Sequence, residues 1–241
     1  SVLAEDCVFE GGTGGVLYDG TGSFGPSAVF RRCRFLDNVG GGGLNVNGPQ
    51  VIVEDCWFEG NRAFGGGGFR VQQVDDLLVR RNVVVGNSAA AQGGGSISRS
   101  YGIVAENTFH GNVSDFEVDG ANLNISSADG SGFIAIENNI FSGARGSHAV
   151  DVPQVITSSS CNVFWDNPLG NVNINYPWDP TDTIQDPQYC DPEAGDLTVS
   201  GTSPCLPAFS GTCGQIGAFG QGCGSVSVES ESWSRIKGAY R

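Results

Sequence analysis

Hydrophobic and polar positions recur along this chain in one short phrase. Two or three apolar or small residues are followed by a polar pair, then by Cys or Asn, then by any residue and finally by Phe. The first two copies are Val2–Phe9 and Ala28–Phe35. The Cys or Asn positions lie 26, 23, 26, 25, 32 and 23 residues apart, at Cys7, Cys33, Cys56, Asn82, Asn107, Asn139 and Asn162. A repeat of about 25 residues therefore organises the chain.

The composition of the repeat indicates short strands. Its copies are rich in β-branched residues and Gly and poor in helix formers, and the period is too short for a propeller blade. Glycine runs at 40–43, 65–68 and 93–95 lead into further strand-like segments and would supply the positive φ of tight corners. The sequence therefore predicts an all-β solenoid with three short strands in each coil.

Stacked coils would place each residue over its own copy in the next coil, about 4.8 Å away. The Asn residues would then hydrogen-bond along the stack, and a second Asn follows several of the Phe residues by three positions. The three cysteines of the column are expected to be buried free thiols rather than a metal site or disulfides between coils. The aromatic part of this core ladder is Phe9, Phe35, Phe58, Phe109, Phe141 and Phe164.

These phrases resemble those of secreted bacterial right-handed parallel β-helix repeat proteins, the pectate-lyase-like superfamily in the broad sense. The Phe-x-x-Asn and glycine-run phrases are similar to those of polymorphic outer-membrane proteins. The resemblance covers residues 1–165 and implies a right-handed parallel β-helix of about seven coils. It implies no single activity, because this fold carries lyases, hydrolases, adhesins and structural proteins.

After Phe164 the repeat stops, and residues 166–223 resemble the segment that closes secreted bacterial β-helices. They would form a C-terminal cap over the last coil, whose core and backbone groups would otherwise be exposed. Short loops close easily, which favours the disulfides Cys190–Cys205 and Cys213–Cys223 among the alternative pairings of these four cysteines. Cys161 would then belong to the core ladder.

Residues 224–241 are predicted to be a Ser/Glu-rich linker and a tail. The tail would either dock on a neighbouring copy or act as a secretion or anchoring signal. Because Ser1 begins directly on a coil, we also expect head-to-tail association, with 226–229 as a strand for an open edge. The tail combines aromatic and cationic side chains on an acidic protein, with Trp233, Arg235, Ile236, Lys237, Tyr240 and Arg241 as its candidate contacts.

The composition limits the kinds of binding partner and the cellular location that we expect for this protein. The formal net charge of −14 argues against nucleic acid, because phosphate binding needs clustered cations. Eight cysteines favour an oxidising location, either extracellular or at a bacterial cell surface, and no apolar run is long enough to span a membrane. No motif requires a cofactor, although an acidic surface suits Ca²⁺, and calcium stays an alternative.

No catalytic set is recognisable in the sequence. Acidic and basic pairs alternate from copy to copy, as Glu5-Asp6, Arg31-Arg32, Glu54-Asp55 and Arg80-Arg81. This alternation favours charge pairing between coils over an aligned calcium site. His110 and His148 are 38 residues apart, and neither has an obvious Ser or Cys partner. Some aromatic residues could stack on sugar rings or pack in the cap and corners, namely Tyr18, Trp57, Trp165, Tyr176 and Trp178.

The function predicted from these features is that of a non-enzymatic extracellular structural protein that associates with itself, with a filament subunit as one form of this association. A polysaccharide-binding or polysaccharide-cleaving β-helix is the first alternative, and an adhesin fragment is the second. The three differ in what the structure should contain: a self-association surface, a groove for sugars, or a long missing N-terminal region.

Overall fold

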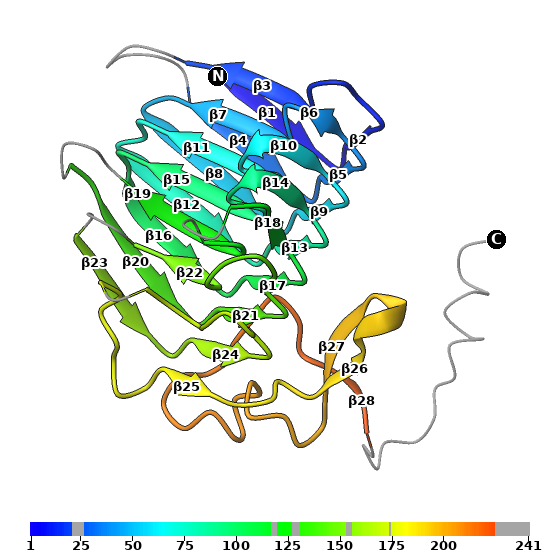
Figure 1. Cartoon of the computed structure of the whole chain (residues 1–241), viewed down its shortest axis with the longest axis vertical. Helices are drawn as coiled ribbons and strands as arrows, with labels where there is room; N and C mark the ends of the chain where they lie inside the picture. Colours follow the sequence, from blue (N-terminus) through cyan, green and yellow to red (C-terminus); the bar gives the residue numbers. More distant parts are fainter. Residues whose placement is uncertain (21–26, 117–119, 127–130, 153–155, 174, 225–241) are drawn as a thin grey trace.

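The computed structural model describes residues 1–20, 27–116, 120–126, 131–152, 156–173 and 175–224. Over these residues the chain winds into an all-β parallel solenoid, and the single helical element is a short 3₁₀ turn, η1 (Pro192–Ala194) (Figure 1). The predicted fold class is therefore confirmed. The predicted tail, Trp233 to Arg241, and the proposed strand at 226–229 lie outside the described residues.

Four parallel sheets, named A to D and defined below, run along the solenoid. Within a coil the chain passes through them in the order A, B, D and C. Sheet A consists of β1 (Val2–Glu5), β4 (Ala28–Arg31), β8 (Gln50–Glu54), β12 (Asp76–Arg80), β16 (Tyr101–Ala105), β20 (Phe133–Glu137) and β23 (Ile156–Ser160). Sheet B consists of β2 (Val8–Glu10), β5 (Arg34–Leu36), β9 (Trp57–Glu59), β13 (Val83–Val85), β17 (Thr108–His110), β21 (Ile140–Ser142), β24 (Val163–Trp165) and β25 (Thr183–Ile184).

The remaining strands form two further faces and a cap sheet. Sheet D consists of β6 (Val39–Gly40), β10 (Arg62–Gly65), β14 (Ser88–Ala91) and β18 (Val113–Ser114). Sheet C consists of β3 (Val16–Asp19), β7 (Leu44–Asn47), β11 (Phe69–Gln72), β15 (Gly95–Ser98), β19 (Leu123–Ser126) and β22 (Val150–Asp151). The cap sheet consists of β26 (Tyr189–Asp191), β27 (Asp196–Ser200) and β28 (Gln221–Cys223).

The coils differ from the predicted ones in two respects. Sheet A has seven strands, but β25 adds an eighth strand to sheet B, so the solenoid has about eight turns. Four coils also contain a fourth strand, which belongs to sheet D. Small inward-facing residues in this segment, such as Ala89 and Ala91, let the chain lie extended against the narrow core.

Aromatic rings form a continuous column in the core. Successive centroids lie 5.0, 4.6, 5.1 and 5.3 Å apart within the two stacks Phe9–Phe35–Phe58 and Phe109–Phe141–Phe164. Val84 takes the aromatic position between the stacks and leaves space for another side chain. The Phe69 ring from sheet C enters this space, with centroids 5.7 Å from Phe58 and 6.3 Å from Phe109.

Buried asparagines form a hydrogen-bonded ladder at the corner between sheets A and B. At Asn107, Oδ1 accepts the Asn82 N–H at 2.9 Å, while Nδ2 donates to Val79 O at 3.0 Å and to Asn139 Oδ1 at 2.9 Å. A second ladder occupies the corner between sheets B and D, at Asn38, Asn61, Asn87 and Asn112. Each amide therefore satisfies buried backbone groups in the neighbouring coils.

Cysteine thiols replace the amides of the first ladder in the first coils. Cys56 Sγ accepts the Cys33 N–H at 3.4 Å and donates to Phe30 O at 3.5 Å, so that it serves both as acceptor and as donor. Cys7, Cys33 and Cys56 are free thiols. Burial raises the pKa of Cys56 to about 12, so this thiol stays protonated at neutral pH.

Residues other than glycine form the corner that precedes each member of the first ladder. All have φ between 51° and 58°, namely Asp6, Arg32, Asp55, Arg81, Glu106, Asn138 and Cys161. In the predicted glycine runs, positive φ occurs at Gly40, Gly42 and Gly66 but at no glycine of 93–95, and glycines outside the runs, such as Gly60 and Gly86, also adopt it. Side chains are tolerated at this corner because they point away from the core, where Arg32 and Arg81 make ion pairs and Asn138 and Cys161 contact the cap.

The predicted disulfides of the cap are wrong. Cys161 pairs with Cys213, Cys190 pairs with Cys223, and Cys205 is a buried free thiol. Cys161 is therefore not a rung of the core ladder; that position belongs to Asn162, which follows it. The short-loop argument failed because the cap folds back onto the coils, which brings its cysteines close to partners distant in sequence.

The cap covers more than the last coil. Tyr176 and Trp178 pack on Phe164 at the end of the solenoid, with centroids 5.7 and 5.2 Å from its ring. The rest of the cap lies along the outer face of sheet B, where Ile140 and Val163 become buried against Cys205 and Ile216. Farther along this face, Phe219 approaches Trp57 at 6.0 Å.

Candidate functional site

The charged corner between sheets A and B is occupied by ion pairs that link successive coils. Glu54 accepts hydrogen bonds from Arg31 and Arg81 at 3.2 and 2.8 Å and from Arg80, and its side chain is 9% exposed. The hydrogen bond from Arg80 holds the pKa of Glu54 below its ordinary value, although burial acts in the opposite direction. These carboxylates therefore have structural partners, as the alternating signs predicted.

A cavity of about 280 Å³ lies between the outer edge of sheet B and the cap. The walls combine an aromatic ring, carboxylates, an amide and an imidazole, contributed by Trp165, Asp166, Asp186, Gln188, His110 and Tyr189. Trp165 is 40% exposed, so its indole is available to a ligand. Arg145 Nη2 contacts the Asp166 carboxylate at 3.3 Å. Such a mixture of one aromatic surface and several polar groups is typical of sites for polar ligands.

Three side chains from different coils and the cap hold the inner wall of this cavity. Ser142 Oγ lies 3.0 Å from His110 Nδ1 and 3.0 Å from the Tyr189 hydroxyl. His110 and Ser142 are register partners in sheet B, which the sequence analysis missed because they are 32 residues apart. Burial, and then the nearby Arg145, lower the pKa of His110. Ser142 is 1% exposed, so this contact orients the imidazole and does not present a nucleophile.

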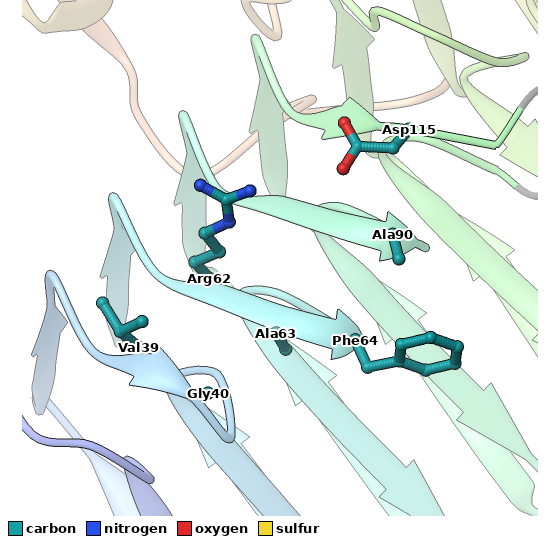
Figure 2. Close-up of a pocket in the computed structure, with 7 residues that line it drawn as sticks. All are labelled: Val39, Gly40, Arg62, Ala63, Phe64, Ala90 and Asp115. Atoms are coloured by element: carbon teal, nitrogen blue, oxygen red, sulfur yellow. The ribbon is translucent and has the colours of Figure 1, made fainter.

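A second hollow, of about 290 Å³, lies on the outer face of sheet D. Figure 2 shows Phe64 at the end of β10, Ala90 on the neighbouring strand and Asp115 beyond it. Phe64 is 76% exposed. Arg62 and Asp115 flank the small floor of the hollow, and neither side chain has an ion pair among the described residues. The hollow therefore combines an aromatic surface with a cation and an anion.

The two hollows lie on adjoining sheets of the solenoid, the first at the outer edge of sheet B and the second on the outer face of sheet D. Arg62 is paired in register with Ser88, Ser88 with Val113, and Val113 bridges to Arg145 beside the cavity. Three steps of about 4.8 Å place Arg62 and Arg145 roughly 14 Å apart along the axis. An extended ligand could therefore contact both hollows at once.

Of the aromatic residues proposed for sugar stacking, Trp165 alone lines either hollow. Trp57 packs on Phe219, while Tyr176 and Trp178 pack around Phe164, so the predicted cap and corner packing applies to these three. Sequence reasoning missed Phe64, which precedes a glycine run and has no counterpart in the repeat phrase. It also missed Asp186, which meets Trp165 only when the cap folds back.

Two further properties of the described residues concern metal ions and membranes. Among the described residues, no group of three or more His, Cys, Asp and Glu side chains could hold a metal ion. Calcium binding stays an untested alternative. No helix in the described part of the chain is long and apolar enough to cross a membrane.

Comparison with known proteins gives a result for the family only. Searches of curated proteins and of solved structures returned no match. The family model described as the right-handed beta helix region matches residues 1–141, which is more than half of the 241 residues. The match covers coils whose registers, aromatic column and asparagine ladders are those described above, and the chain therefore belongs to the right-handed beta helix family.

Proposed function

We propose that this chain is an extracellular glycan-binding β-helix, which holds a polysaccharide along the face formed by sheet D and the adjoining edge of the cap. The observation that carries the proposal is the position of Trp165 and Phe64. Each exposed ring lines a hollow that also contains a carboxylate, and the two hollows lie on adjoining sheets. A single long ligand fits this arrangement better than two unrelated small ones.

The chemistry of both hollows suits a sugar chain. An aromatic ring can cover the apolar face of a pyranose, while carboxylates accept hydrogen bonds from its hydroxyl groups. Asp115 and Asp186 supply such acceptors, and Arg62 supplies donors at the opposite side of the Phe64 hollow. Because the protein carries a formal net charge of −14, we expect neutral polysaccharides to bind better than strongly anionic ones.

An extracellular location is part of this proposal. Two disulfides attach and close the cap, and structural disulfides persist in oxidising compartments. The family resemblance and the disulfides together support a secreted bacterial protein. Self-association through the tail remains a prediction, because Trp233 to Arg241 lie outside the described residues.

Affinity electrophoresis in gels that contain xylan, glucomannan, dextran or polygalacturonate tests the proposal. We expect at least one neutral polysaccharide to slow the protein. Trp165→Ala should weaken binding about tenfold, because an aromatic contact contributes on the order of 1.5 kcal/mol. Phe64→Ala should weaken it as well for a chain long enough to reach both hollows.

Phe209→Ala is the matched control, because Phe209 is 55% exposed and lines neither hollow. This variant should migrate like the wild type. Unchanged mobility in every polysaccharide, or equal effects of Trp165→Ala and Phe209→Ala, would refute glycan binding at this face. Release of reducing ends or unsaturated products from a bound polysaccharide would instead favour the cleaving alternative.

A further inference from the structure

The outer face of sheet A carries a stripe of aliphatic side chains that points away from the core. Register pairs connect its members across five consecutive strands: Leu3, Val29, Ile52, Leu78 and Ile103. Their immediate neighbours in sequence, such as Val51 and Val53, are completely buried, so the stripe residues face outward. Leu3 is 65% exposed and Ile103 is 41% exposed, while the three between them are partly exposed.

A row of alternating charges runs beside the stripe. In register order along the sheet it reads Glu5, Arg31, Glu54 and Arg80. On the other side of the stripe, the corresponding row ends in two exposed aromatic residues, Tyr101 at 47% and Phe133 at 40% exposure. The stripe is therefore an apolar strip bounded by one strongly patterned charged row. Contiguous apolar strips of this kind mark interaction surfaces on soluble proteins.

The order of the charges selects the partner. Suppose that two copies pack sheet A against sheet A with their solenoid axes antiparallel. A two-fold axis that runs parallel to the strands, midway between β4 and β8, then places each row of one copy over the same row of the other. Glu5 then lies opposite Arg80, and Arg31 lies opposite Glu54. Every charge in the row meets the opposite sign, because an alternating row of four is complementary to its own reverse.

The same axis also matches the apolar residues. Leu3 lies opposite Leu78, and Val29 lies opposite Ile52, so four of the five stripe residues are covered, and Ile103 lies beyond the partner's β1. Packing with parallel axes would instead place the charged row over the row that contains Tyr101 and Phe133. In that arrangement Arg31 and Glu54 would face Ser27 and Gln50, and Arg80 alone would face a residue of opposite charge, Asp76, so the charges are matched less completely.

We propose that sheet A is a self-association surface through which a second copy of this chain packs face to face with an antiparallel axis. The strip is about 19 Å long, four steps of about 4.8 Å, which is small for a permanent interface. The dimer should therefore be weak and depend on concentration. This contact is lateral and does not rest on glycan binding, so either proposal can fail alone.

Sedimentation equilibrium over a wide range of protein concentration tests the dimer. Ile52→Asp should raise the dimer Kd about tenfold or more, because it places a carboxylate at the centre of the apolar contact. Leu17→Asp is the matched control, since Leu17 is 70% exposed on sheet C, and it should leave the Kd unchanged. Circular dichroism would show that both variants keep the fold.

Cysteine cross-linking tests the orientation in a Cys7→Ser background, which removes the one free thiol that is not buried. A mixture of Leu3→Cys and Leu78→Cys proteins should form mixed disulfide dimers upon oxidation, whereas each protein alone should not. A strictly monomeric protein, a Kd unaffected by Ile52→Asp, or cross-linking of Leu3→Cys only with itself would each overturn the proposal. Large head-to-tail species insensitive to Ile52→Asp would also overturn it.

Discussion

Gly95 lies directly against the ring of Phe69, its register partner in the neighbouring strand of sheet C. A Cβ at Gly95 would overlap three atoms of that ring. Phe69 cannot easily move aside, because its ring fills the space that Val84 leaves in the aromatic column. The small side chain of Val84 in sheet B therefore explains why position 95, on a different face of the solenoid, is a glycine.

Gly95→Ala should destabilise the protein by about 1–3 kcal/mol, since a methyl group would have to displace a packed ring. The free energy of unfolding from guanidinium titrations measures this effect. Gly14→Ala serves as the control, because a Cβ at Gly14 would meet no atom within 4 Å. Equal stability of the two variants would mean that Phe69 has room to relax.

The thiol rungs of the first ladder suggest a second substitution. Asn107→Ala would leave the Asn82 N–H and the Val79 carbonyl without their side-chain partner, at a cost of about 2–4 kcal/mol. Asn107→Cys should cost clearly less, because Cys56 performs both hydrogen-bonding roles in the same column. Denaturant titrations of the two variants give the comparison. If Asn107→Cys were as unstable as Asn107→Ala, the thiols of the ladder would contribute packing but no stabilising hydrogen bonds.

Glu54 is the most enclosed member of the charged row, and Glu54→Gln should cost about 1–3 kcal/mol near neutral pH. Its pKa is lowered in the folded protein, chiefly by the hydrogen bond from Arg80. The stabilisation is therefore complete above the ordinary carboxyl pKa of 4.5 and is lost as pH falls through the lowered value. Thermal melts of wild type and variant should converge only in strongly acidic solution.

Glu106→Gln is the control for this effect. Its carboxylate is 37% exposed and lies 3.9 Å from Arg81, so the substitution should change the free energy of unfolding by less than about 0.5 kcal/mol. A loss as large as that of Glu54→Gln would show that the total charge of the row, and not the enclosure of Glu54, determines stability.

The repeat made the solenoid predictable, because every coil must bury the same face and the period alone brings Phe35 over Phe58. Local exceptions were not predictable. Nothing in the phrase around Val84 indicates that Phe69 from another sheet replaces the missing ring. The fourth strand was also hidden, since β14 (Ser88–Ala91) consists of small residues without a hydrophobic alternation.

Most of the candidate site could not be predicted from the sequence, because its contacts depend on tertiary packing outside the repeat. A cap without repeats gives no register, so the approach of Asp186 to Trp165 and the pairing of Cys161 with Cys213 depend on tertiary packing alone. His110 and Ser142 could have been paired, because both follow a ladder Phe by one residue. That shared offset was the one usable signal for the inner wall of the cavity.

His110, in the wall of the cavity, should make the stability of the protein depend on pH. Burial lowers its pKa below the ordinary value of 6.5, so between the two values the unfolded chain binds a proton that the folded protein does not. Stability contributed by neutral His110 is therefore complete above about pH 6.5 and declines as pH falls toward the lowered pKa. Wild-type melting temperatures should decrease from pH 7 to pH 5, and His110→Gln should flatten this slope. His148→Gln, which changes the other histidine, should retain it. A slope that survives in His110→Gln but disappears in His148→Gln would show that a different contact controls the acid sensitivity.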